Sequence, residues 1–320
     1  MKALVADGPG GPEVFHLAEV ETPRPGRGEL LVKVAACGLN PVDYKIRKGY
    51  FSQGRQYPAI YGYDVCGQVV EAVGGAFAPG DEVYYFAPLL KPGAYAEYHL
   101  VSADIVDHKP ENLSCVEAAS LPLAGVTALQ GLFNHLKLTT GETILIIGAA
   151  GGVGSLAAQM AAWKGARVIG VCSGVNAKFV RNMGADHVID YTRDDVAAEV
   201  ARITAGEGAH TAYDLVGGES FALCVDCLGP NGRLAFTNAF ANWQERLMET
   251  MNKARPKNLS IHCQLAQTSG KDMRTLSFLA RKGFLKPQVT QVIALDRTPE
   301  AHRRLETMHG RGKIVVDMGL

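Results

Sequence analysis

A buried strand, a glycine turn and a helix follow one another between residues 143 and 160, and this succession constrains the fold more than any other feature. The apolar run Thr143 to Ile147 precedes glycines at positions 148, 151 and 154, and the helical pattern Ser155 to Met160 follows them. Glycines at this spacing permit a tight turn, a close backbone approach and close packing of helix on strand. The helix N-terminus offers amides and a positive dipole to phosphate. The stretch therefore predicts the pyrophosphate site of a dinucleotide.

The next strand indicates which dinucleotide is bound. Gly165 ends the helix, and Ala166 to Cys172 reads as a buried parallel strand. An NAD site usually has Asp or Glu about 20 residues past the glycine turn, to hold the ribose 2′-OH. This chain has Cys172 and Ser173 there, without a carboxylate to repel a 2′-phosphate, and the basic residues Lys178 and Arg181 follow closely. We therefore expect NADPH, although both basic residues could simply form the solvated face of the helix 176–183.

Composition excludes several classes of partner. Lys and Arg together number 32, as do Asp and Glu, so no net field attracts nucleic acid or an acidic membrane surface. Residues 1–7 lack the features of a signal peptide and no apolar run reaches membrane-spanning length, which predicts a cytoplasmic protein. The seven cysteines are scattered and do not suggest a disulfide framework. Cys224 and Cys227 form a C-x-x-C, which we interpret as buried helix cysteines and not as half of a zinc site.

The chain has two regions that differ in their pattern of strands, turns and helices. Residues 1–118 are rich in strands and turns and predict an antiparallel, barrel-like domain, with strands at 15–20, 29–35, 67–73, 82–86 and 95–101. Ser114 to Glu117 is a capping box that opens a helical stretch to Leu136.

Strands and helices then alternate to residue 263, with further strands at 187–190, 213–216, 233–237 and 259–263, which predicts βαβ units and a parallel sheet. The basic cluster 253–257 is expected to be an exposed loop. The tail adds a helix at 271–282, a strand at 289–295, a helix capped by Thr298 with Pro299 at its first position, and a strand at 313–316. We expect the tail strands to return to the first domain.

Six motifs accompany the glycine turn in a fixed order: Cys37 to Asp43, Gly62 to Gly67, Pro79 to Val83, Ala124 to Ala128, Gly184 to Tyr191 and Gly312 to Val315. Together they resemble the medium-chain dehydrogenase/reductase superfamily, and most of all its zinc-independent quinone oxidoreductases, the relatives of zeta-crystallin. The resemblance implies an α/β protein with a GroES-like β-barrel catalytic domain at 1–118 and 266–320 and a Rossmann NADPH-binding domain at 119–265. It also implies an active site in the cleft between the domains and a homodimer through edge strands of the cofactor domains.

Departures from the zinc-dependent members bear on the chemistry. In those enzymes a Cys and a His bind the catalytic metal at the positions that Asn40 and Tyr63 occupy here. Zinc favours thiolate, imidazole and carboxylate ligands, so neither an amide nor a phenol suits it. The four cysteines of the structural zinc lobe are also missing, since only Cys115 lies between residues 67 and 171. We expect no metal at either position.

Without zinc, the hydride acceptor must already be electrophilic, as a quinone or an α,β-unsaturated carbonyl is. The sequence thus predicts an NADPH-dependent reductase of small molecules of this kind. Two alternatives stay open: a zinc-free enoyl or aldehyde/alcohol oxidoreductase, and a crystallin-like protein that binds NADPH without turnover.

Four residues are the catalytic candidates. Asn40 could donate its amide to a substrate oxygen or to the cofactor ribose, and Asp43 could hold the loop 39–45 in shape. Tyr50 is the preferred proton donor or aromatic clamp, although a tyrosine that stacks without proton transfer fits equally well. Tyr63 is the fourth candidate and offers a further phenol, as does Tyr44, which is not among the four.

The resemblance also carries over cofactor contacts residue by residue. Thr127 is expected beside the nicotinamide, and Asn238 and Lys313, next to Gly312, on the same side of the cofactor. Tyr191 is expected at the adenosine phosphate, and Ser173 and Lys178 at the 2′-phosphate. The pyrophosphate turn comprises Gly148, Ala150, Gly151, Gly152, Val153 and Gly154. Many NADPH-binding relatives have Lys or Arg at the positions of Val175 and Asn176, and their absence here weakens the case for NADPH.

Overall fold

The chain folds into two units, each with its own hydrophobic core. The computed structural model describes residues 1–50, 54–237, 243–307 and 310–320. The first unit comprises residues 1–126 and 267–320, and the second comprises residues 127–266. The sequence placed the first boundary at residue 118, so residues 119–126 lie in the first unit instead of the second.

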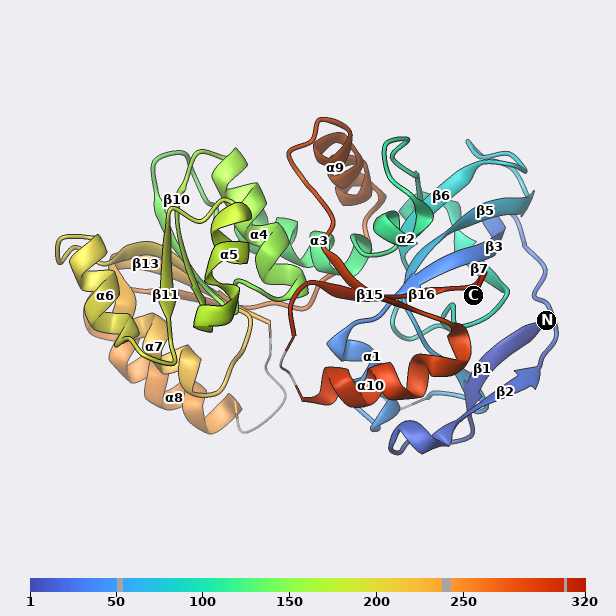
Figure 1. Cartoon of the computed structure of the whole chain (residues 1–320), viewed down its shortest axis with the longest axis horizontal. Coiled ribbons are helices and arrows are strands. Elements are labelled where there is room, and N and C mark those ends of the chain that lie inside the picture. The colour runs from blue at the N-terminus through green and yellow to red at the C-terminus, as the bar shows by residue number, and fades with distance from the viewer. Residues whose placement is uncertain (51–53, 238–242, 308–309) are drawn as a thin grey trace. The chain divides into compact units, whose positions relative to one another are not determined.

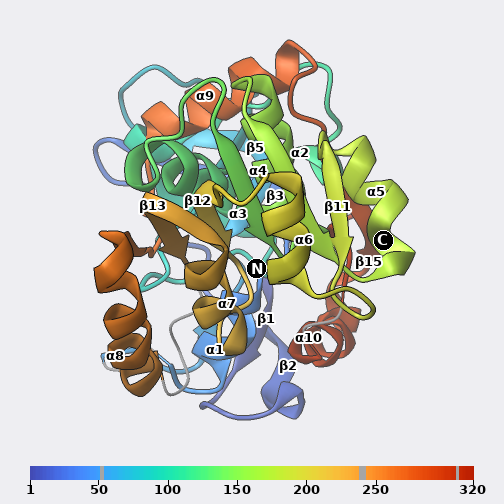
Figure 2. The same cartoon turned by 90° about the vertical axis from the view of Figure 1, so that its left-hand side faces the viewer.

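The second unit is built on a six-stranded parallel sheet of order β11-β10-β9-β12-β13-β14. This is the order 3-2-1-4-5-6 of dinucleotide-binding folds. Figure 2 shows β13 and β12 toward one end of this sheet and β11 toward the other. Its strands are β9 (Thr143–Ile147), β10 (Arg167–Cys172), β11 (His187–Asp190), β12 (Ala209–Asp214), β13 (Leu228–Phe236) and β14 (Ser260–Cys263). The predicted parallel α/β architecture is confirmed.

Helices cover both faces of this sheet (Figure 1). On one face, Ile169 and Val171 of β10 join an apolar cluster with residues of α6, α7 and α8. The residue between them, Gly170, points the other way, where a Cβ would meet Val180 of α5 at 2.6 Å. The helices are α4 (Gly152–Trp163), α5 (Ala177–Asn182), α6 (Val196–Ile203), α7 (Glu219–Cys227) and α8 (Trp243–Ala254).

The basic cluster at 253–257 is not the exposed loop that we expected. It forms the end of α8 and the 3₁₀ turn Arg255–Lys257. The Lys257 ammonium donates hydrogen bonds of 2.9, 3.0 and 2.7 Å to the carbonyl oxygens of Val225, Asp226 and Leu228. The last carbonyls of a helix have no hydrogen-bond partner within it, so the Lys257 ammonium supplies partners for the carbonyls at the C-terminus of α7.

The first unit contains two sheets. One has the order β2-β1-β4, and the other has the order β15-β16-β3-β5-β6-β8, with β7 also pairing with β3. A hydrogen bond of 2.8 Å from the Leu4 amide to the Tyr95 carbonyl links β1 to the segment before β7. The strands are β1 (Lys2–Ala6), β2 (Phe15–Glu19), β3 (Glu29–Gly38), β4 (Ala59–Ile60), β5 (Asp64–Ala72), β6 (Glu82–Phe86), β7 (Tyr98–Ser102), β8 (Asp107–His108), β15 (Val289–Ile293) and β16 (Lys313–Asp317).

The tail returns to the first unit as expected, because β16 pairs antiparallel with β3. The capping box is confirmed at α2, where the Ser114 hydroxyl accepts from the Glu117 amide at 3.2 Å. Thr298 is the first residue of α10 and not its N-cap, which is Arg297. The helices are α1 (Pro41–Arg47), α2 (Cys115–Ala118), α3 (Pro122–Leu129), α9 (Gly270–Arg281) and α10 (Thr298–Glu306). The last three residues of α3 belong to the second unit.

Candidate active site

The glycine turn of the second unit has the geometry of a phosphate cradle. Gly148 leaves β9 with φ +77°, a conformation that favours glycine. A Cβ at Gly154 would lie 2.2 Å from the Gly148 carbonyl oxygen and 2.7 Å from the Ala149 Cα, so α4 can approach β9 this closely only with glycine there. These two positions explain why the turn must be glycine-rich.

The N-terminus of α4 has backbone amides that could bind an anion. Its N-cap, Gly151, is extended and has no side chain to accept the first-turn amides. The amides of Gly152, Val153 and Gly154 are therefore left for an external acceptor, and the helix dipole favours a negative one. Ala150 is buried just before the cap. The residues predicted for the pyrophosphate thus lie together in one turn.

Ser173 lies where the sequence placed it, directly after β10. It is the N-cap of the 3₁₀ turn Gly174–Asn176, and its hydroxyl accepts from the side-chain amide of Asn176 at 3.1 Å. Lys178 and Arg181 are exposed on α5, and Tyr191, which follows β11, is 54% exposed. Exposed cations beside this turn are available to a phosphate, and the exposed phenol ring to an adenosine group.

One expectation about this region is wrong. The sequence has no carboxylate after β10, but the structure supplies one from the neighbouring strand. Asp190 pairs in register with Cys172, and a Cβ on Gly174 would meet its Oδ2 at 2.2 Å. Hydrogen bonds, first of all from the Thr192 hydroxyl, lower the pKa of Asp190, which is therefore ionised. A negative charge thus stands beside the turn that was predicted to receive a 2′-phosphate.

Thr127 is held in place by hydrogen bonds to its backbone carbonyl. Its carbonyl oxygen accepts two hydrogen bonds of 2.8 Å, from the Tyr213 hydroxyl and from the Gln264 amide. Tyr213 and Gln264 lie in β12 and just after β14, so the central sheet fixes the position of this predicted nicotinamide contact. Asn238, the other contact predicted on this side in the second unit, lies outside the described residues.

Asn40, Asp43, Asp64 and Lys313 form a buried polar cluster in the first unit. The Asn40 amide donates to Asp64 at 2.8 Å, and its oxygen accepts from the Lys313 ammonium. The same ammonium donates to Asp64 at 3.0 Å and to the Leu39 carbonyl at 2.8 Å. An ammonium has three hydrogens, and all three are donated within the protein.

This arrangement changes how Asn40 and Lys313 act. Asn40 is 3% exposed and Lys313 is 6% exposed. The sequence assigned the first a direct contact with substrate or ribose and the second a contact with the cofactor. Such a contact would require one of these internal hydrogen bonds to be exchanged, so both residues are placed to position the backbone around them. Asp64 was missed as a site residue, although it belongs to the quoted motif Gly62 to Gly67.

Asp43 shapes the start of α1. Its carboxylate accepts from the backbone amide of Asn40 at 2.7 Å in a capping box, so the predicted loop around Asp43 is a helix. The Tyr95 hydroxyl donates to the same oxygen at 3.3 Å and lies 3.3 Å from His302 Nε2. Burial raises the pKa of Asp43 to about 7 and lowers the pKa of His302 to about 3. Neither Tyr95 nor His302 was singled out by its sequence context.

The two tyrosine candidates differ in exposure. Tyr63 is fully buried, and burial raises its pKa, which leaves its phenol protonated and away from solvent. Tyr50 is 44% exposed just after α1. Of the two, only Tyr50 presents its ring to solvent, where a substrate could reach it. No group of three or more His, Cys, Asp or Glu residues within the described parts of the chain is arranged to hold a metal ion.

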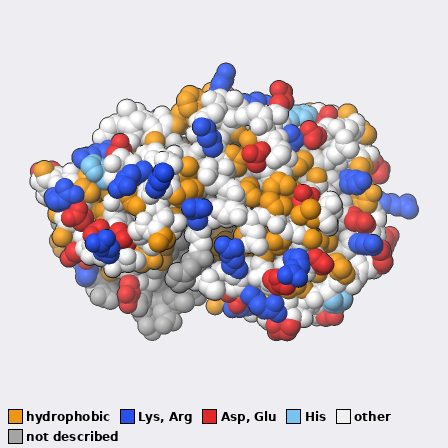
Figure 3. Space-filling view, in the orientation of Figure 1, with side chains coloured by type: hydrophobic (Ala, Val, Ile, Leu, Met, Phe, Trp, Pro, Cys, Tyr) orange, Lys and Arg blue, Asp and Glu red, His pale blue; other side chains and the backbone are white. Residues whose placement is uncertain are grey.

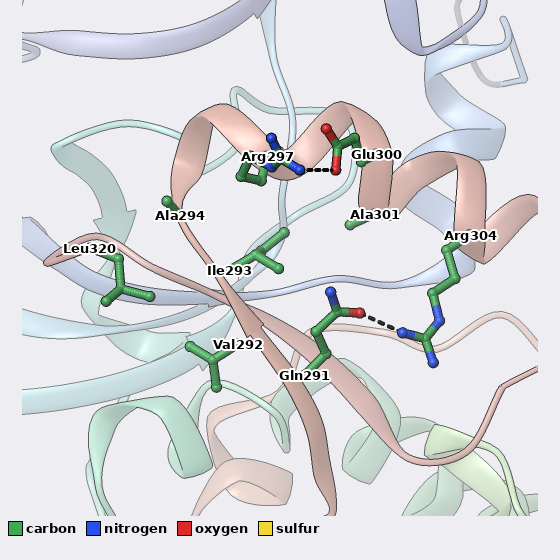
Figure 4. A pocket seen from close by; sticks show the side chains of 9 residues that line it. All are labelled: Gln291, Val292, Ile293, Ala294, Arg297, Glu300, Ala301, Arg304 and Leu320. Carbon is green, nitrogen blue, oxygen red and sulfur yellow. Dashed lines mark hydrogen bonds and ion pairs between the residues drawn. The ribbon is translucent and has the colours of Figure 1, made fainter.

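A hollow of the first unit is lined by residues of β15 and α10, none of which is a predicted site residue. Figure 4 shows that its two arginines are already engaged, Arg297 with Glu300 and Arg304 with the Gln291 side chain, both at 2.6 Å. Positive and negative side chains are mixed across the face seen in Figure 3. Neither feature offers a second charged site.

Comparison with known proteins assigns the family. The model of the alcohol dehydrogenase GroES-like domain matches residues 26–111, and that of zinc-binding dehydrogenases matches residues 183–316. The NAD(P)H oxidoreductase RTN4IP1, mitochondrial, of Danio rerio is 31% identical over 91% of this chain and 84% of its own. The quinone oxidoreductase from Coxiella burnetii superposes with a TM-score of 0.89 at 33% identity, covering 99% of both chains. A structure described as an NAD-dependent alcohol dehydrogenase covers 100% of both chains with a TM-score of 0.93 at 32% identity.

The chain belongs to the quinone oxidoreductases of the medium-chain dehydrogenase/reductase superfamily. Three further relatives bear the name quinone oxidoreductase or quinone-oxidoreductase. The protein is accordingly an oxidoreductase that uses a nicotinamide cofactor. In the described residues we found no helix with the length and apolar character needed to cross a membrane.

Proposed function

We propose that this oxidoreductase transfers hydride from NADPH to a quinone or an α,β-unsaturated carbonyl, without zinc. The observation that carries the proposal is the buried cluster around Lys313. Its ammonium donates to Asn40 and Asp64, so the oxygen atoms that could face a metal already face a cation of the protein itself. An amide at position 40 and a buried phenol at position 63 are poor zinc ligands as well.

The second unit supports the cofactor part of the proposal. The glycine turn at Gly148 to Gly154 supports a pyrophosphate site, because its backbone amides have no side chain of the N-cap in front of them. Thr127, whose position is fixed by hydrogen bonds to Tyr213 and Gln264, is proposed as the contact to the nicotinamide. When bound, the reduced nicotinamide supplies the hydride. Ser173 and the exposed Lys178 and Arg181 support NADPH, because a hydroxyl and two cations that follow β10 could hold a 2′-phosphate even with the carboxylate of Asp190 nearby.

The first unit supplies the groups proposed for the substrate. Asn40, Asp64 and Lys313 act as positioning residues that hold the start of α1, and Tyr50 follows the end of that helix. Tyr50 then either clamps the acceptor with its ring or donates a proton to the reduced oxygen. A hydroquinone oxygen can also take its proton from water, so the clamp alone suffices for quinones.

One experiment tests the acceptor, the cofactor and the metal together. The oxidation of NADPH and of NADH is followed with 9,10-phenanthrenequinone, using protein dialysed against metal-free buffer and checked by elemental analysis. We expect turnover by zinc-free protein and a higher kcat/KM for NADPH than for NADH. Equal constants or a preference for NADH would refute the cofactor assignment. Zinc that survives dialysis at near one equivalent would refute the zinc-free mechanism.

The likeness to an NAD-dependent alcohol dehydrogenase favours one alternative, a zinc-free alcohol or aldehyde oxidoreductase. Asp190 is the feature of this chain that suits NAD, because a carboxylate at this edge can accept from a ribose hydroxyl. Oxidation of primary and secondary alcohols with NAD⁺, in the absence of quinone turnover, would establish it. We also propose a homodimer through β14, the edge strand of the parallel sheet, which light scattering of the purified protein would test.

A further inference from the structure

Two cysteines far apart in the sequence meet in the first unit. Cys66 lies in β5 and Cys115 is the first residue of α2, and their sulfur atoms are 2.7 Å apart. Helix α2 packs against β3 and β5 (Figure 1). Non-bonded heavy atoms prefer a separation of about 3.5–4.0 Å, and a disulfide bond is about 2.05 Å long. The two sulfurs are therefore already in contact, and less than about 1 Å of further approach would join them.

The two thiols have unlike surroundings. Cys66 is fully buried, whereas Cys115 is partly exposed. The hydrogen bond from Cys66 lowers the pKa of Cys115, and burial raises the pKa of Cys66. Among the charged neighbours, the Lys109 ammonium favours a thiolate at Cys115, while Glu82 and Asp317 oppose it. Lys109 is itself held nearby, since it donates to the Leu113 carbonyl at 2.7 Å. Cys115 is thus the accessible nucleophile of the pair and Cys66 its buried proton donor.

We propose that Cys115 and Cys66 form a reversible oxidation site, in which a hydroperoxide oxidises Cys115 and Cys66 then closes an intramolecular disulfide. The Cys115 thiolate attacks the peroxide, the O–O bond breaks, and hydroxide leaves with a sulfenic acid on Cys115. Cys66 loses its proton and attacks the Cys115 sulfur, the S–O bond breaks, and water leaves. Two thiols and one hydrogen peroxide thus give one disulfide and two waters, and a dithiol reductant reverses the change.

The other cysteines provide an internal comparison. Cys263 is exposed at the end of β14, in the other unit. Cys224 and Cys227 lie on α7, where burial raises the pKa of both thiols. Exposure alone would make Cys263 the first to oxidise, and sequence spacing alone would favour Cys224 and Cys227. Contact between the sulfurs favours Cys66 and Cys115.

The test uses the full chain, reduced, freed of reductant and treated with hydrogen peroxide at low molar excess. After the remaining thiols are blocked, peptide mapping is expected to find Cys66 linked to Cys115. The intact mass should fall by two hydrogen atoms and return after treatment with dithiothreitol. If Cys263 becomes oxidised while Cys66 and Cys115 remain free to alkylate, the proposal is wrong. A linkage between Cys224 and Cys227 alone would also overturn it.

Variants then assign the two roles. Cys66→Ala should trap a sulfenic acid on Cys115 that dimedone captures, and Cys115→Ala should abolish the mass loss. The matched variant Cys263→Ala should keep both the mass loss and its rate. Dimedone capture on Cys66 in Cys115→Ala would reverse the assignment and contradict the roles given above. Because the mapping on the unchanged protein is decisive by itself, the outcome does not depend on how well either variant folds.

Discussion

Asp190 is the residue at which cofactor choice should be most sensitive. Its ionised carboxylate lies close to Gly174, next to Ser173 and just before the helix α5 that carries the exposed cations Lys178 and Arg181. The change Asp190→Asn removes this charge and keeps the side-chain size. We expect the ratio of kcat/KM for NADPH to that for NADH to rise by roughly three- to tenfold, because a like charge no longer opposes a 2′-phosphate.

The matched control for this change is Glu199→Gln. Glu199 is also a carboxylate of the second unit, but it is engaged with Arg202 on α6 at 2.7 Å. Its loss should leave the ratio unchanged, and both ratios should be measured at low and high salt, since salt screens exposed charges. An unchanged or lowered ratio in Asp190→Asn would show that this carboxylate does not face the 2′ position.

At the scale of elements, the contact between α4 and β9 is the tightest feature of the cofactor turn. In Gly154→Ala the new Cβ would overlap the Gly148 carbonyl oxygen, and neither backbone can move aside alone. We expect a loss of about 1–3 kcal/mol in the free energy of unfolding, as for other overpacked sites. The KM for NADPH should also rise at least severalfold, because the first-turn amides of α4 shift. Urea unfolding and steady-state kinetics measure the two effects.

Gly8→Ala is the control, because a Cβ there meets no atom within 4 Å and the backbone φ is not positive. It should leave both quantities nearly unchanged. A Gly154→Ala protein with unchanged stability and KM would mean that α4 is not held against β9 as closely as described.

Local patterns predicted the elements best. The bounds of β6, β9 and β11 coincide with the sequence-based ranges, because each has an apolar centre and lies between turn signals. The strand expected at 213–216 was placed too late, since β12 ends at Asp214, whose carboxylate turns the chain by accepting from the amides of Val216 and Gly217. Helix α1 was missed because its capping box starts from Asn-Pro, which reads as a turn.

Contacts between distant segments could not be predicted in the same way. Lys313 reaches Asn40 across 273 positions and Cys66 reaches Cys115 across 49. Asp190 reaches the turn after β10 only through the register of two parallel strands. The sequence identified Asn40 and Lys313 as site residues, but pairing of β16 with β3 is what makes them neighbours of Asp64. The sequence could therefore identify several site residues, but which residues they contact depends on the fold.

At the scale of the whole molecule, buried titratable groups should set the pH dependence of stability. Burial lowers the pKa of His99 to about 4 and that of His302 to about 3, and it raises the pKa of Asp43 to about 7. Unfolded His and Asp titrate near 6.5 and 3.9. Between about pH 4 and 6.5, the two histidines are therefore protonated in the unfolded chain and neutral in the folded chain. Asp43 behaves in the opposite way, since it is protonated in the folded chain and ionised in the unfolded chain.

For these three groups the balance is one more proton on the unfolded chain, so together they should make stability rise with pH in this window by about 1.4 kcal/mol per pH unit. From about pH 6.5 to 7 Asp43 acts alone among these groups, so stability should fall slightly there and level off above about pH 7. His302→Gln removes one of the two protons that only the unfolded chain binds and should lower the slope between about pH 4.5 and 6 by about 1.4 kcal/mol per pH unit, whereas Asp43→Asn should raise it by about the same amount. The exposed His16 provides the control, since His16→Gln should keep the original slope. Urea unfolding across this pH range measures all four slopes, and a slope in His302→Gln equal to that of the unchanged protein would show that His302 becomes charged in the folded state.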